Sequence, residues 1–295
     1  MVRIGMADRI FLLTRRELMA GLGAAALAQA APPMAAAQTR SSLTLRAKTD
    51  VIALRPGEPV TPIWSLQGAT PRPGLRFRRG DAVEVTLENE LPVPMALSCH
   101  GIDGVPAVEP LAARAPLAPG GSETCVIPLR QAGTFLCDLR LLGDGLARPS
   151  SARALVVGES GPVPVDRDEV LLIEDWRLRP DGTAIAPGTD PRDTAPFITI
   201  NGMTALDLPI RSHQRLRLRF INGFQRNVIA VKIEGHEVRV MAIDGQPAEP
   251  FPARNGALVL APGAGSTRSS MRRHRPARPH RSCCTMAPRP VPLLV

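Results

Sequence analysis

The chain has 295 residues, a formal net charge of +9 and a hydrophobic content of 44%, which suits about two domains with buried cores. The positive charge lies at the two ends: residues 264–295 contain seven arginines and no acidic residue, residues 1–37 contain four arginines and two acidic residues, and residues 38–263 sum to zero. This distribution argues against a basic groove, so we expect no specific nucleic-acid partner.

Residues 1–37 have the pattern of an export signal. Arg15 and Arg16 stand in the run TRRELM, which resembles the twin-arginine motif and precedes an apolar stretch rich in Ala and Gly. This stretch is too short for a stable transmembrane segment, and it leads to a cleavage signal of small residues near Ala37. We therefore expect the twin-arginine translocase as a partner during export and a periplasmic location. An amphipathic N-terminal helix is the alternative.

The body that follows alternates apolar and polar residues, as strands do. In residues 82–89 (AVEVTLEN), Val83, Val85 and Leu87 fall on one face, and acidic residues and a threonine fall on the other. No long stretch has apolar residues at helical spacing. Many short strands separated by turn residues predict an all-β fold of sandwiches or barrels.

Residues 122–141 (SETCVIPLRQAGTFLCDLRL) are predicted to form two strands around a turn at residues 131–133. Cys125 and Cys137 stand symmetrically about this turn, so they would face one another across a hairpin. A disulfide between them suits an oxidising compartment, whereas the strain of directly opposed cysteines favours two unlinked thiols.

Two later segments, residues 214–223 (QRLRLRFING) and residues 236–247 (HEVRVMAIDGQP), repeat the strand pattern. In the first of them, Leu216, Leu218 and Phe220 alternate with Arg217, Arg219 and Ile221, as in a strand. After Gly263 the alternation stops and an Arg- and Pro-rich sequence begins, which cannot bury enough apolar surface to order itself.

Three runs, in this order, resemble the multicopper oxidase family. The first domain of the family is similar to LRFRRGDAVEVTLENELPVPMALSCHGIDGVP and to LAPGGSETCVIPLRQAGTFLCDLRLLGDGLARPSSARALVVGE. Its second domain is similar to FITINGMTALDLPIRSHQRLRLRFINGFQRNVIAVKIEGHEVRVMAIDGQPAEPF. The resemblance implies an all-β fold of tandem cupredoxin-like Greek-key β-sandwiches, and a function in the copper-dependent oxidation of a substrate with reduction of oxygen.

The resemblance also implies a division of the chain. We expect the twin-arginine export signal in residues 1–37, a first cupredoxin-like domain in residues 38–158, an incomplete second one in residues 159–263, and a disordered basic tail in residues 264–295. Two origins of the tail stay open. One is a shift of the reading frame near Gly263, and the other is a functional arm that binds anionic lipid or nucleic acid.

Copper is the cofactor of the family, and the resemblance implies which positions bind it. In the H-x-H-G motif of the family, Ser98 replaces the first histidine and His100 keeps the second. In the second H-x-H motif, Asp138 and Arg140 replace both histidines. His100 is therefore the only retained ligand position in these motifs. We expect no trinuclear copper centre, no bound copper and no catalytic residue, because one imidazole does not make a chelating site.

A polar cluster is our hypothesis for these degenerate positions. Asp138 and Arg140 are two apart on a predicted strand, so they share a face, and the family geometry would place them near His100. An ion pair with Arg140 would then occupy the former copper cavity. The alternatives are an adventitious metal ion at His100 and an ordinary hydrogen-bonded histidine at a strand end.

Adjacent acids on a predicted strand face opposite ways, and the histidines and the cysteine pair lack a partner at ligand spacing, so these other candidate groups are assigned structural or solvent-facing roles. They are His213, His236, His274, His280, the pair Cys283–Cys284, and the acids Glu174–Asp175 beside Trp176.

Three functions stay open from the sequence. By family the chain is a copper-binding oxidoreductase. By its residues it is a catalytically inactive, copper-free cupredoxin scaffold that binds a periplasmic protein. The resemblance offers a precedent, because relatives without copper ligands exist among the exported cell-division proteins. The third possibility is a frame-shifted fragment.

Overall fold

The computed structural model describes residues 40–68, 74–102, 115–141, 148–186, 188–211, 213–224, 227–233, 238–263 and 265–270. All of them belong to one compact unit, Thr39–Val295. Their regular structure is β-strand apart from one 3-10 turn, Arg254–Gly256, so the prediction of an all-β fold is confirmed. These residues include no helix that is long and apolar enough to cross a membrane. The predicted export signal with Arg15 and Arg16 lies outside the described residues.

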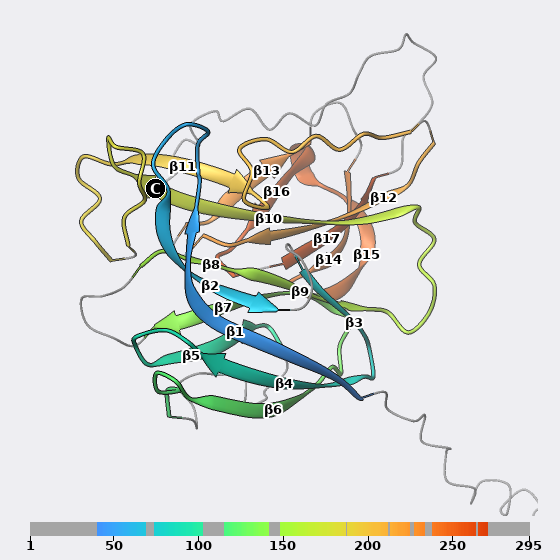
Figure 1. Cartoon of the computed structure of the whole chain (residues 1–295). Helices are drawn as coiled ribbons and strands as arrows, with labels where there is room; N and C mark the ends of the chain where they lie inside the picture. Colours follow the sequence, from blue (N-terminus) through green and yellow to red (C-terminus); the bar gives the residue numbers. More distant parts are fainter. Residues whose placement is uncertain are drawn as a thin grey trace, which may run out of the picture. The chain divides into compact units, whose positions relative to one another are not determined.

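Strands β1–β9 form two sheets, drawn in blue to green in Figure 1. The first sheet has the order β6-β4-β1-β2-β8 and the second has the order β3-β9-β7-β5. The strands are β1 (Arg40–Ile52), β2 (Thr61–Gly68), β3 (Gly74–Arg78), β4 (Ala82–Asn89), β5 (Met95–His100), β6 (Ser122–Pro128), β7 (Gly133–Leu141), β8 (Ser150–Ser151) and β9 (Arg153–Gly158). We call them the first sandwich.

The alternation of apolar residues builds the core of the first sandwich. Val83, Val85 and Leu87 of β4 point inward, as predicted, and pack in one cluster with residues of the opposite sheet such as Leu97 and Leu155. Each buried aliphatic side chain of this kind stabilises the fold by about 1.5–3 kcal/mol. The cluster therefore holds the two sheets face to face.

The two strands predicted in residues 122–141 are present as β6 and β7. The prediction that they pair as a hairpin is wrong. Strand β6 pairs with β4, whereas β7 pairs with β5 and β9 in the other sheet, so the chain crosses between sheets after Pro128. Cys125 therefore lies opposite Val85 rather than opposite Cys137. Alternation fixes which face of a strand a residue occupies, but it carries no information about the strand that lies beside it.

The second sandwich consists of β10–β17, in yellow to red in Figure 1. One sheet has the order β11-β10-β12-β17-β14-β15, and β13 and β16 form a separate pair. The strands are β10 (Arg167–Leu178), β11 (Ala195–Ile200), β12 (Leu216–Asn222), β13 (Ile229–Lys232), β14 (Val238–Ile243), β15 (Gln246–Pro252), β16 (Ala257–Leu260) and β17 (Gly265–Ser270). An apolar cluster from both sheets forms its core.

Strand β12 is buried along its whole length, including its two arginines. Arg217 is only 8% exposed and Arg219 only 1%. One face of β12 belongs to the core of the second sandwich. On the other face, Ile221 packs with Leu136 and Ala154 of the first sandwich. The second sandwich therefore buries this face of β12 against the first.

The expectation that the chain loses regular structure at residue 264 is wrong for the residues that follow directly. Strand β17 lies between β12 and β14 and pairs antiparallel with both of them. Strand β17 is therefore a central strand of its sheet. The periodicity of the sequence did not indicate a strand in this segment. Residues 271–295, which hold most of the predicted tail, lie outside the described residues.

Candidate functional site

Strands β5 and β7 carry the predicted ligand positions and pair antiparallel. In their register, Ser98 lies opposite Asp138 and Cys99 lies opposite Cys137. Both cysteines belong to the core cluster of the first sandwich. Because successive residues of a strand point to opposite faces, Ser98, His100 and Asp138 lie on the face turned away from that core.

A polar contact joins His100 to Asp138 on this face. Nε2 of His100 lies 3.2 Å from Oδ1 of Asp138, and the two side chains are 28% and 20% exposed. The structure thus brings together two members of the predicted cluster. The third, Arg140, follows on β7 opposite Ala96, and its side chain lies outside the described part of the structure.

The imidazole of His100 lies against a turn of the second sandwich. A Cβ atom added to Gly263 would come within 3.3 Å of Nδ1 of His100. Gly263 also has a φ of +72°, which disfavours residues with a side chain. Its N–H donates a hydrogen bond of 2.9 Å to the carbonyl oxygen of Asn222. The absence of a side chain at Gly263 therefore lets the imidazole ring of His100 pack against this turn.

The donor atoms at this face are few. Within the described ranges, no three His, Cys, Asp or Glu side chains are grouped so that they could hold a metal ion. His100 and Asp138 supply one nitrogen and one carboxylate, and Cys99 and Cys137 lie on the other face of the strands. A carboxylate that accepts a hydrogen bond from an imidazole orients the ring. These donor atoms favour a hydrogen bond between His100 and Asp138 over a metal ion bound at His100.

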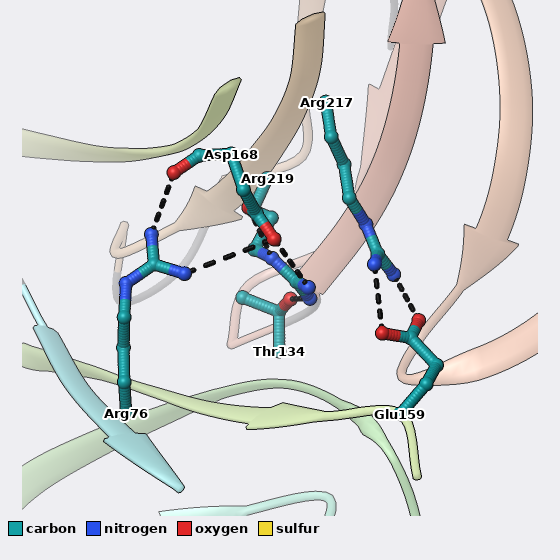
Figure 2. A network of polar contacts seen from close by, with 6 residues as sticks. All are labelled: Arg76, Thr134, Glu159, Asp168, Arg217 and Arg219. Carbon is teal, nitrogen blue, oxygen red and sulfur yellow. Dashed lines mark hydrogen bonds and ion pairs between the residues drawn. The ribbon is translucent and has the colours of Figure 1, made fainter. Parts of the chain in front are cut away.

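A second polar cluster, which the sequence analysis did not predict, lies where β12 meets the first sandwich (Figure 2). The guanidinium of Arg219 donates two hydrogen bonds, of 2.7 and 2.8 Å, to the carboxylate of Asp168. It donates a third, of 2.8 Å, to the hydroxyl of Thr134 on β7. Arg76 of β3 donates to the backbone oxygen of Asp168 at 2.8 Å. These contacts tie the two sandwiches together.

Arg217 makes the next contact along β12, also drawn in Figure 2. It forms two hydrogen bonds with the carboxylate of Glu159, one of them 2.8 Å long. These hydrogen bonds, with the charges of Arg217 and Arg219, lower the pKa of Glu159 against the opposing effect of its burial. The sequence carries one sign of this cluster, namely two arginines at alternate positions of an otherwise apolar strand.

The acids at residues 174 and 175 do not form a catalytic pair of carboxylates. Glu174 is 7% exposed and accepts a hydrogen bond of 3.1 Å from the N–H of Ala152. Asp175 is the next residue of β10 and therefore faces the other side. Nε1 of Trp176 donates to the hydroxyl of Thr199 at 3.0 Å. Glu174 and Trp176 thus have the structural roles that were expected of this segment.

His213 lies in the turn before β12, with a φ of 63°. The other histidines and cysteines that the sequence analysis assigned to structural or solvent-facing roles lie outside the described residues; they are His236, His274, His280, Cys283 and Cys284.

Comparison with known proteins agrees with this architecture. Two family profiles, both described as multicopper oxidase, match residues 49–137 and residues 167–264, together more than half of the chain. Multicopper oxidase MmcO of Mycobacterium tuberculosis is 26% identical over 266 residues, which are 76% of this chain and 50% of MmcO. Cell division protein FtsP of Pectobacterium atrosepticum is 29% identical over 224 residues, which are 70% of this chain and 46% of FtsP.

Solved structures show the same fold. A multi-copper oxidase from Pseudomonas Thermotolerans has a TM-score of 0.68 and 27% identity, over 80% of this chain and 59% of that one. This likeness confirms the prediction of cupredoxin-like domains. The chain spans about half, or less, of the length of the curated relatives it matches. From the two profiles and these relatives, the chain belongs to the multicopper oxidase family.

Proposed function

We propose that this chain keeps the fold of the multicopper oxidases without their copper chemistry, and that it is exported to the periplasm, where it binds another protein. The observation that carries the proposal is the donor set on β5 and β7. Position 100 has the imidazole of the family motif, and positions 98 and 138 have a hydroxyl and a carboxylate instead.

The described residues do not fit a trinuclear copper centre. Such a centre needs several neutral imidazoles, which are the ligands that suit copper. Here Asp138 lies 3.2 Å from the imidazole of His100, and a buried serine, Ser98, stands at the other motif position of β5. Position 140 is an arginine, which stays positively charged at any physiological pH and cannot act as a ligand. This donor set therefore does not support the oxidation chemistry of the family.

A role in protein binding draws support from one relative, which is named as a cell division protein. Under this proposal the tagged chain co-purifies with a specific protein from periplasmic extract, and recovery of the chain alone would contradict it. The second candidate function is copper-dependent oxidation, which family membership and the likeness to MmcO favour.

Copper content separates the two candidates. The full-length chain is incubated with Cu(II), freed of unbound ions and analysed for copper per chain and for oxygen consumption with a phenolic reductant. We expect less than one copper per chain and no oxygen uptake above buffer. The control is His100→Ala, which removes the one retained imidazole and is expected to behave like the wild type. Several copper ions per chain together with oxygen uptake would refute the proposal.

Export is tested through the two N-terminal arginines. We expect Arg15→Lys combined with Arg16→Lys to keep the chain in the cytoplasmic fraction, because the twin-arginine translocase reads the arginine pair. The wild type should appear in the periplasmic fraction with a new N-terminus near residue 38. Equal periplasmic amounts of the variant and the wild type would contradict export by this route.

A further inference from the structure

The cysteines on the core side of β5 and β7 are the starting point. Cys99 lies directly opposite Cys137 in the antiparallel register, although 38 positions separate them in the sequence. Their Sγ atoms lie 2.6 Å apart. Opposed residues of antiparallel strands have Cα atoms about 4.5–5.5 Å apart, and a disulfide requires a Cα separation of about 4.4–6.8 Å. Although a disulfide between directly opposed cysteines is strained, the backbone spacing of paired strands falls within the range that the bond requires.

The surroundings of the two sulfur atoms are apolar. Cys99 is 4% exposed and Cys137 is 1% exposed. A small cavity of the core touches both cysteines and is lined by aliphatic and aromatic side chains such as Leu97, Leu155 and Phe77. The hydrogen bond with Cys137, together with burial, raises the pKa of the Cys99 thiol well above its ordinary value. Inside the folded sandwich, this thiol is therefore a poor nucleophile.

We propose that Cys99 and Cys137 form a disulfide that links β5 to β7. The oxidant is a protein or small-molecule disulfide of an oxidising compartment. One cysteine thiolate attacks a sulfur atom of the donor disulfide and releases one donor thiol. The second thiolate then displaces the second donor thiol from this mixed disulfide. The two cysteines lose two protons and two electrons, and the donor is reduced to two thiols.

Burial determines when the bond forms. Because both sulfurs are enclosed, the donor reaches them while β5 and β7 are still open, during folding or during local opening. Once the strands have closed, the same burial protects the bond from reductants. The link restrains the two strands that also carry His100 and Asp138 on their other face.

The pairing is specific for Cys137 and Cys99. Cys125 lies on β6 in the other sheet, opposite Val85, and is less buried than the other two. In the cell the disulfide rests on the proposed export for its oxidant. Refolding with added oxidant needs neither export nor copper, so a failure of the disulfide and a failure of the proposed function can be told apart.

The test uses the full-length chain and a variant that combines Cys125→Ser, Cys283→Ser and Cys284→Ser. Each is refolded with oxidised glutathione, denatured in alkylating reagent without reductant, digested and mapped by mass spectrometry. We expect one linked pair of peptides, containing Cys99 and Cys137, with the mass of two hydrogens missing and sensitivity to dithiothreitol. Closing this loop should raise the Tm on the order of 10 °C relative to the reduced protein.

Matched single variants complete the test. Cys125→Ser is expected to keep the link and the redox dependence of the Tm, whereas Cys99→Ser and Cys137→Ser lose both. Peptide mapping of the wild type gives a result even if a single variant does not fold. Full alkylation of Cys99 and Cys137 in the refolded wild type, or a link from Cys137 to Cys125, would overturn the proposal.

Discussion

The polar cluster at His100 and the one at Arg219 differ in how completely they are enclosed. In the first cluster, Nε2 of His100 lies 3.2 Å from Oδ1 of Asp138, and the two side chains are 28% and 20% exposed. The side chain of Arg219 is 1% exposed, and its guanidinium makes three hydrogen bonds to Asp168 and Thr134. Burial of a charge is tolerated only where its donors are satisfied, and the second cluster meets that condition.

The residues at the family ligand positions are thus more exposed to solvent than those of the Arg219 cluster. The contact at His100 lies where solvent reaches and weakens it. The contacts at Arg219 lie in a buried seam between the two sandwiches, where an unpaired partner is costly. We therefore expect the Arg219 cluster to contribute to stability and the His100 pair to contribute little.

The largest effect is expected for Arg219→Met, which keeps much of the side-chain volume and removes the three hydrogen bonds. It leaves Asp168 and Thr134 without this donor, so the free energy of unfolding should fall by about 3 kcal/mol. Urea unfolding followed by intrinsic fluorescence measures it. The control is Arg76→Met, whose guanidinium is half exposed and should cost about 1 kcal/mol or less. Equal free energies of unfolding of the two variants would contradict a larger contribution of the buried Arg219 cluster.

An intermediate effect with a defined pH dependence is expected for Glu159→Gln. Arg217 lowers the pKa of Glu159 in the folded chain, so the carboxylate stabilises the fold above its unfolded-state pKa, and this stability is lost as the pH falls through the folded-state pKa. The wild type should exceed the variant by about 1 kcal/mol or less at pH 7, since the carboxylate is partly exposed. The difference should shrink as the pH falls below the ordinary pKa of a glutamate, about 4.3, and vanish once the pH is below the lowered folded-state pKa. A difference in unfolding free energy that grows toward acid would contradict the assignment.

The smallest effect is expected for Asp138→Asn, which keeps the shape of the side chain and removes its charge. We expect a loss of about 0.5 kcal/mol or less, because both side chains of the contact with His100 are partly exposed to solvent. A double-mutant cycle with His100→Gln measures the coupling between the two residues. A loss as large as that of Arg219→Met would reverse the order of the two clusters.

Arg140→Leu sharpens the same measurement. If the Arg140 guanidinium pairs with Asp138, as the sequence analysis predicts, this substitution leaves the carboxylate without that partner and lowers the Tm. An unchanged Tm would remove Arg140 from the cluster.

Much of the fold followed from local pattern. The alternation in residues 82–89 correctly placed Val83, Val85 and Leu87 in the core, and three runs of motif residues indicated the family. The approach of Asp138 to His100 was also expected, but only through the geometry of that family. Alternation also separated Arg217 and Arg219 from the apolar face of β12, but it did not reveal that these arginines are buried, because the first sandwich covers their face.

The sequence by itself determined the strand-rich architecture and the residue types at the degenerate ligand positions, because side-chain alternation and motif identity are local properties. Only the tertiary structure decided that Cys137 faces Cys99, that β12 is buried on both faces and that Gly265–Ser270 is a central strand. Those outcomes depend on which distant strands lie side by side. That choice is a balance of burial and backbone hydrogen bonding over the whole chain, and no short window of sequence contains it.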